Sequence, residues 1–132
     1  MIPTNEEWIR LANTFQIERR DEEGVRILAL DGYLDAHTAP EFEKAIENEV
    51  AEGRFKIVAD CSKLTYISSA GLGVFMSFIE EIRERNGDIK IAAVRPKVFQ
   101  VFDVLGFPIL FDITATVADA RRKFEDAGER GV

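Results

Sequence analysis

Residues 55–87 read FKIVADCSKLTYISSAGLGVFMSFIEEIRERNG. The first six of these residues are largely apolar and rich in β-branched side chains, which is typical of a strand covered on both faces. Later residues place apolar side chains at helical spacing: Leu72, Phe75, Met76, Ile79 and Ile82. Two serines, Ser68 and Ser69, precede this stripe, and Asn86-Gly87 follows it. The pattern therefore predicts a central strand at 55–60 and a helix that begins at one of the two serines.

The sequence on either side predicts further strands that alternate with helices. Strands are expected at 15–19, 25–30, 89–94 and 109–111, with a hairpin turn at Gly24 between the first two. Helices are expected from a Thr38–Glu41 capping box to Gly53, from Pro96 to Gly106, and from a Thr116 cap to about Asp126. This order predicts one α/β domain with parallel neighbouring strands and a hairpin at one side. We expect its core to include Ile27, Val58, Leu72, Phe75, Ile79, Ile91, Phe99 and Phe102.

The two ends of the chain read as additions to a domain over residues 14–127. Thr4 and Glu7 match a capping box, and the apolar residues Trp8, Ile9 and Leu11 follow. Residues 1–13 are therefore expected to form a short accessory helix, which either folds back onto the domain or builds a homodimer. The Gly-rich residues 128–132 are expected to form a flexible tail.

The composition excludes several classes of function. The 132 residues include 17 Lys and Arg against 24 Asp and Glu, for a net charge of −7, so a surface that neutralises nucleic-acid phosphates is not expected. A single Cys and a single His exclude a disulfide framework, a Cys-based zinc site and a His-pair metal site. Neither a signal-peptide pattern nor an apolar run of about 20 residues is present. We therefore expect a cytoplasmic protein with no metal or other cofactor and no membrane insertion.

Patterns that would indicate an enzyme are incomplete. Residues 71–76 read GLGVFM, with Met where a dinucleotide-binding fingerprint needs its third glycine. Ser69 as a catalytic nucleophile would need a base, and the only histidine, His37, is expected in an exposed loop. Three aspartates fall where strands are expected to end: Asp31, Asp35 and Asp60. Because Asp is common at such positions for local hydrogen bonding, we expect no enzyme and keep a catalytic or nucleotide-binding site at these aspartates as a minor hypothesis.

The two adjacent serines suggest a different chemistry. A helix start needs only one capping hydroxyl, which accepts a hydrogen bond from an amide two or three residues on. The other hydroxyl is then free at the positive end of the helix. A phosphate placed there would meet free N–H groups and the helix dipole, and would turn a neutral surface strongly negative. Ser68-Ser69 is therefore chemically suited to a phosphorylation switch.

Three stretches of the chain resemble those of one family, the STAS domain in its anti-sigma factor antagonist branch. Residues 60–74, DCSKLTYISSAGLGV, look like the family's D-x-S-x-[LV]-x-[FY]-[IM]-[DS]-S-x-G-[LI] signature. Residues 32–39, GYLDAHTA, are similar to its G-x-L-D-x-x-[TN]-[AV] loop, and residues 95–107, RPKVFQVFDVLGF, resemble its later P-x-V-x-x-[LF]-x-x-x-G-[LF] helix. The resemblance covers roughly residues 15–127, with all three motifs in order.

The resemblance implies a small mixed sheet with helices packed mainly on one side, and a role in partner switching. Such proteins bind an anti-sigma factor that is also a serine kinase; phosphorylation breaks the complex, and a PP2C-type phosphatase restores it. Carried over to this chain, Ser69 is the phosphoacceptor and Ser68 the helix cap, at a position where the family most often has Asp. The implied partner-binding residues are Asp35, His37, Thr38, Ser68, Ser69, Ala70, Gly71 and Leu72. The alternative is a constitutive STAS adaptor or scaffold subunit of a signalling or transporter assembly, in which Ser69 is only structural.

Overall fold

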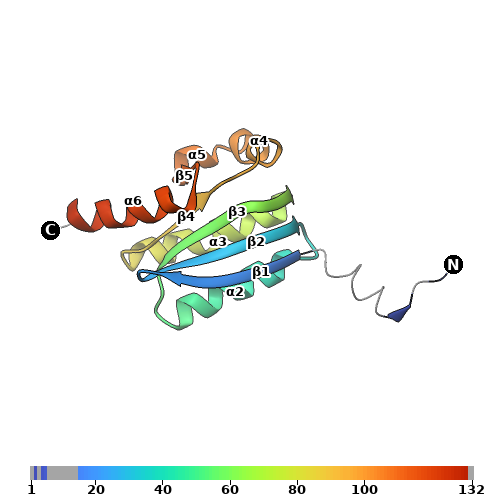
Figure 1. Cartoon of the computed structure of the whole chain (residues 1–132), viewed down its shortest axis with the longest axis horizontal. Coiled ribbons are helices and arrows are strands. Elements are labelled where there is room, and N and C mark those ends of the chain that lie inside the picture. The colour runs from blue at the N-terminus through green and yellow to red at the C-terminus, as the bar shows by residue number, and fades with distance from the viewer. Residues whose placement is uncertain (1, 3, 6–14, 131–132) are drawn as a thin grey trace.

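The five strands form one mixed sheet in the order β1-β2-β3-β4-β5 (Figure 1). In the computed structural model, which describes residues 2, 4–5 and 15–130, the strands are β1 (Phe15–Glu22), β2 (Val25–Leu34), β3 (Lys56–Ile67), β4 (Asp88–Ala92) and β5 (Ile113–Thr114). β1 and β2 pair antiparallel, and every later pair is parallel. The predicted hairpin at one side and the predicted central strand are both confirmed. Most of the expected accessory helix at 1–13 lies outside the described residues.

Helices cover the two faces of the sheet unequally. They are α2 (Ala39–Ala51), α3 (Ser69–Glu84), α4 (Pro96–Val104), α5 (Phe107–Leu110) and α6 (Val117–Arg130). Residues of α2, α3, α4 and α5 share one large buried cluster, whereas α6 packs on the opposite face (Figure 1). The expectation of helices mainly on one side is confirmed. No helix among the described residues is long and apolar enough to cross a membrane.

The two clusters follow from the alternation of side chains along the strands. In β3, Ile57 and Ala59 point into the larger cluster, while Val58 points into the smaller one beneath Ala120 and Phe124 of α6. The expected core is confirmed at Ile27, Val58, Leu72, Phe75, Ile79, Ile91 and Phe102. Phe99 is the exception, because it is only partly buried on α4.

Several element boundaries differ from the sequence-based expectations. β2 and β3 both continue beyond their predicted ends, to Leu34 and Ile67. The predicted ends were too early because the outward face of these strand ends carries polar side chains, which resemble a loop pattern. Residues 109–111 do not form a strand: α5 ends at Leu110, and the last strand is the two-residue β5. Helix α6 continues to Arg130, into the segment that was expected to be a tail.

Candidate functional site

The predicted serine pair lies where β3 passes into α3. Ser68 occupies the N-cap position with an extended backbone (φ −105°, ψ 174°), and the Leu72 amide donates to its carbonyl at 3.1 Å. Ser69 is the first helical residue and is exposed. The Ser68 side chain, however, makes no capping hydrogen bond, and its Oγ is buried without a hydrogen-bond partner. The expectation that the Ser68 hydroxyl caps the helix is therefore wrong, although the helix begins where predicted.

Gly71 brings the first turn of α3 into direct contact with the ends of β2 and β3. A Cβ built on Gly71 would lie 2.7 Å from Leu34 Cγ, 2.9 Å from Ile67 Cγ1 and 3.0 Å from the Leu34 carbonyl oxygen. Carbon atoms in good contact are about 3.5–4.0 Å apart, so no larger residue fits without displacement. The glycine thus fixes the height of the Ser69 backbone above the sheet.

The loop that follows β2 is held by a compact set of hydrogen bonds around Asp35 and Thr38. Asp35 Oδ1 accepts from the backbone amides of His37 (2.9 Å) and Thr38 (3.2 Å). The Thr38 hydroxyl donates to the Tyr33 carbonyl (2.8 Å) and accepts from the Asp35 amide (2.9 Å). Desolvation disfavours the charged Asp35 carboxylate, but the bonds from His37 and Thr38 outweigh it and lower the pKa of Asp35.

This arrangement corrects the capping box expected at Thr38. Thr38 does precede α2, but its side chain makes no cap hydrogen bond because its hydroxyl is engaged with Tyr33 and Asp35. The Thr38 side chain stabilises the loop before the helix instead of the helix itself. It is buried, so its role is to shape the loop that presents Asp35 and His37.

The loop and the start of α3 are neighbours at one end of the sheet. The Ser68 amide donates to the Leu34 carbonyl at 2.9 Å, which joins the end of β3 to the last residue before the loop. The structure thus brings the predicted partner-binding residues together. Within the set, His37 and Ser69 are exposed, and Asp35, Ser68 and Ala70 are partly exposed. Thr38, Gly71 and Leu72 are buried, so they position the surface and do not form it.

A groove beside Ser69 was not anticipated from the sequence. It runs between the start of α3 and one side of α4, and its lining residues are Ile67, Ser68, Ser69, Lys97, Gln100, Val101, Val104 and Leu105. The groove is mainly apolar, and it exposes 83% of Val104 and 53% of Leu105. The sequence signal was the apolar pattern of residues 98–105, from which only Phe99 and Phe102 were assigned to the core. The neighbouring Val104 and Leu105 line the groove and are exposed to solvent.

An exposed aromatic pair marks the opposite face of the sheet at the same end. Tyr33 and Tyr66 lie side by side on β2 and β3, with ring centroids 5.8 Å apart. Tyr33 is 53% exposed and Tyr66 48%. Their neighbours Leu34 and Ile67 point into the core, so alternation places the two rings outward. These rings form an exposed apolar area on that face, which the sequence did not single out.

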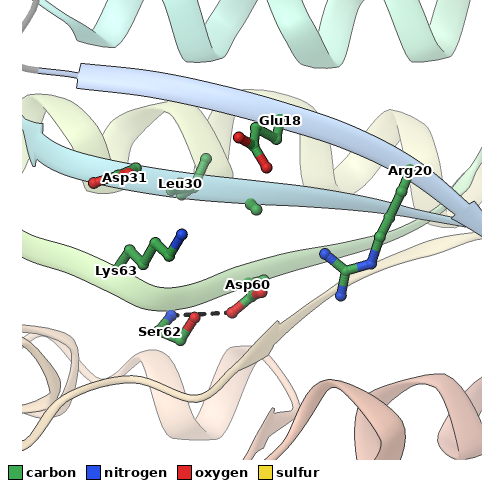
Figure 2. A pocket seen from close by; sticks show the side chains of 8 residues that line it. Glu18, Arg20, Leu30, Asp31, Asp60, Ser62 and Lys63 are labelled. Carbon is green, nitrogen blue, oxygen red and sulfur yellow. Dashed lines mark hydrogen bonds between the residues drawn. The ribbon is translucent and has the colours of Figure 1, made fainter.

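The three aspartates considered for catalysis do not form one site. Asp31 and Asp60 line a shallow pocket on the open face of β1, β2 and β3, together with Glu18, Arg20, Ala29, Leu30, Ser62 and Lys63 (Figure 2). Asp35 does not line this pocket. Asp60 Oδ1 accepts from the Ser62 amide at 3.0 Å, which is the local role typical of Asp at a strand bend. Within the described part of the chain, no group of three His, Cys, Asp or Glu is placed to hold a metal ion.

Comparison with known proteins agrees with the motifs at Ser69 and at the Asp35 loop. The sequence model of the STAS domain matches residues 16–120, which includes both motifs. The chain belongs to the STAS domain family. Its hairpin, central β3 and one-sided helical layer are therefore the STAS arrangement in this protein.

Several STAS relatives carry names that bear on function. BtrV of Bordetella bronchiseptica, proposed to be an anti-sigma factor antagonist, is 30% identical over 105 residues, which is 80% of this chain and 90% of BtrV. The anti-sigma-B factor antagonist of Listeria monocytogenes is 29% identical over 101 residues, covering 76% of this chain and 87% of that protein.

Among solved structures, the anti-sigma factor antagonist SpoIIAA shares the STAS fold. Its unphosphorylated form superposes with a TM-score of 0.70 at 23% identity, covering 89% of this chain and 97% of SpoIIAA. The phosphorylated form from Bacillus gives a TM-score of 0.63 at 22% identity, covering 83% of this chain and 97% of that one. At these identities the likeness shows the fold alone.

Proposed function

We propose that this STAS protein is an anti-sigma factor antagonist that works by partner switching. Unphosphorylated, it binds an anti-sigma factor serine kinase through the Ser69 helix start and the Asp35–Thr38 loop; phosphorylation of Ser69 releases it, and a PP2C-type phosphatase restores binding. The names of the relatives support this assignment. It places the protein in the cytoplasm, where sigma factors act, as a regulator whose chemistry is carried out by its partners.

The observation that carries the proposal is the position of the Ser69 hydroxyl. Ser69 is exposed at the first position of α3, and among the described residues no side chain or backbone group engages it in a hydrogen bond. The Ser68 amide donates to the Leu34 carbonyl, and the buried Gly71 packs against Leu34, so the backbone on either side of Ser69 is held against the sheet. A kinase therefore meets an accessible hydroxyl on a rigid support.

The modification itself is a single phosphoryl transfer. Ser69 Oγ attacks the γ-phosphorus of ATP in the partner's active site, an O–P bond forms, and the bond to the β–γ bridging oxygen breaks so that ADP leaves. The hydroxyl proton passes to a base on the kinase. The phosphatase later delivers water to the same phosphorus and returns the Ser69 hydroxyl and inorganic phosphate.

Two opposing effects decide what the phosphate does to the complex. It adds about −1.5 to −2 charges at a helix N-terminus. At an exposed helix end the helix dipole stabilises an anion by about 0.3–1 kcal/mol. Buried against a partner matched to a neutral hydroxyl, the same charge costs several kcal/mol. The second effect is larger, so the complex should weaken at least about a hundredfold, which corresponds to roughly 3 kcal/mol.

The test is the affinity of matched forms for a kinase-type anti-sigma factor from the same source. We expect phosphorylated protein to bind at least about a hundredfold more weakly than wild type, Ser69→Asp to show part of that loss, and Ser69→Ala to bind permanently and to be insensitive to ATP. Ser77→Asp is the control, because Ser77 is exposed farther along the same helix. Equal affinities for unmodified and phosphorylated protein would refute the switch and favour the constitutive adaptor.

The proposal includes a second interface at residues 1–13, whose apolar residues would build a homodimer. Sedimentation of the full chain and of residues 14–132 at several concentrations tests this interface. Identical monomeric behaviour of both would contradict it and would leave the switch at Ser69 unaffected.

A further inference from the structure

The groove beside Ser69 contains one charged residue. Lys97 lines it together with Ser68 and Ser69, and the remaining lining is apolar apart from Gln100. Lys97 is exposed, and its ammonium makes no ion pair or hydrogen bond with any described residue. A lysine without a partner thus lies along the same groove as an unengaged serine hydroxyl.

The local charge around the groove contrasts with the charge of the whole chain. The chain carries a net charge of −7, yet neither α3 nor α4 has an acidic residue in its first turn. Both helices begin near the groove, so their positive dipole ends are not neutralised by their own side chains. The surroundings of Ser69 are therefore suited to an anion.

The position of Lys97 within α4 is unfavourable for the helix itself. α4 begins at Pro96, so Lys97 is in the first turn, where the dipole disfavours a cation. No contact within the described structure offsets this cost. The lysine is thus placed where the isolated helix would not favour it, and the groove supplies a reason for it to be there.

We propose that Lys97 is the internal counterion of phosphorylated Ser69, and that it draws the phosphate along the groove between α3 and α4. This inference rests on the proposed phosphorylation of Ser69 and adds the group that receives the phosphate. In the unphosphorylated protein the groove is open and mainly apolar. In the phosphorylated protein the ion pair between Lys97 and the Ser69 phosphate lies at the opening of the groove. The surface of the groove then exposes less apolar area and is no longer uncharged at Ser69.

The experiment measures the second pKa of the phosphate by ³¹P NMR titration. Phosphoserine is installed at position 69 during translation, so the measurement does not depend on a kinase. The wild-type background is compared with Lys97→Gln and with Lys56→Gln. Lys56 is exposed and begins β3, whose other end leads to Ser69, so at about 3.3 Å per residue it lies roughly 35 Å from the phosphate, well beyond the Debye length of about 10 Å.

We expect the phosphate pKa, ordinarily near 6, to be about 0.5 lower in the wild-type background than in Lys97→Gln, because a nearby cation favours the dianion. The difference should shrink in 1 M NaCl, and Lys56→Gln should match wild type. Equal pKa values in the wild-type and Lys97→Gln proteins would overturn the proposal, as would an equal rise in both variants. Failure of the anti-sigma factor kinase to modify Ser69 would refute the proposed function without altering this titration.

Discussion

Replacing Gly71 with Ala tests how closely α3 approaches the sheet. The new Cβ would lie 2.7 Å from Leu34 Cγ and 2.9 Å from Ile67 Cγ1, about 1 Å closer than carbon atoms normally pack. Neither neighbour can turn aside, because Leu34 is fully buried and Ile67 is 3% exposed. The third contact, at 3.0 Å, is the Leu34 carbonyl oxygen that accepts from the Ser68 amide. Relief of the clash must therefore displace the helix start or the end of β2.

The magnitude follows from two opposing terms. Ala is a better helix former than Gly by about 1 kcal/mol, whereas overpacking a core typically costs about 1–3 kcal/mol. Gly73 provides the matched control, because it lies in the same helix, is exposed and has no atom within 4 Å of an added Cβ. Gly73→Ala should therefore stabilise the protein by up to about 1 kcal/mol, and Gly71→Ala should be less stable than Gly73→Ala by about 1–3 kcal/mol.

Urea denaturation of the wild type and both variants measures this difference. Changes in the midpoint at constant slope report stability directly. We expect Gly71→Ala to unfold at a lower urea concentration than wild type and Gly73→Ala at a higher one. Equal stabilisation by both substitutions would show that the first turn of α3 has room at Gly71, and would refute the tight contact that we assign to the Ser69 support.

Three further predictions follow from the described contacts. Ser68→Ala should leave the thermal midpoint unchanged or slightly raised, because it removes a buried hydroxyl without a partner, and Ser69→Ala should change the free energy of unfolding by less than about 0.5 kcal/mol; a clear loss in Ser68→Ala would restore the capping role. The hydrogen bond from Lys90 lowers the pKa of Asp112, so its stabilisation is present above the unfolded pKa of about 3.9 and is lost as pH falls through the folded pKa. Asp112→Asn should therefore flatten the loss of stability in urea titrations below about pH 4. Burial, with a smaller effect from Asp60, raises the pKa of the Cys61 thiol, so a thiol reagent should label Cys61 only when the protein unfolds; fast labelling of native protein would show that β3 opens.

Strong local patterns predicted the element types and the position of the site. The apolar stripe after Ser69 and the closing Asn86-Gly87 fixed α3 to within a few residues. The Thr116 cap was also predicted correctly, since the Thr116 hydroxyl accepts from the Asp119 amide at 3.0 Å. Here the sequence and the tertiary structure require the same local conformation.

The failures arise where tertiary contacts override local patterns. Thr38 and Ser68 occupy cap positions, but one hydroxyl is recruited by the preceding loop and the other is buried without a partner. The segment 61–67 resembled a loop because only one face of β3 is covered there. Residues 109–111 resembled a strand because three apolar residues in succession do not distinguish a helix from a strand.

The groove beside Ser69 was missed for a related reason. Apolar residues at helical spacing predict which face of a helix is buried, but α4 is apolar on more than the face that packs on β3. Val98 and Phe102 are buried, whereas Val104 and Leu105 face solvent. A single sequence does not separate these two faces, because both carry the same residue types. The groove became visible only when α3 and α4 were placed together.

The exposed position of Ser69 also determines how this protein would store information. Because Ser69 lies on the surface while Gly71 and Leu72 hold the backbone from beneath, we expect both covalent states to share one folded structure. The state of the switch is then set by the phosphorylated fraction of the protein. It is not set by a conformational equilibrium that temperature or ligand concentration would shift. That proportion persists without further ATP consumption until a phosphatase changes it. The protein would therefore act as a chemical memory whose content is rewritten only by enzymes.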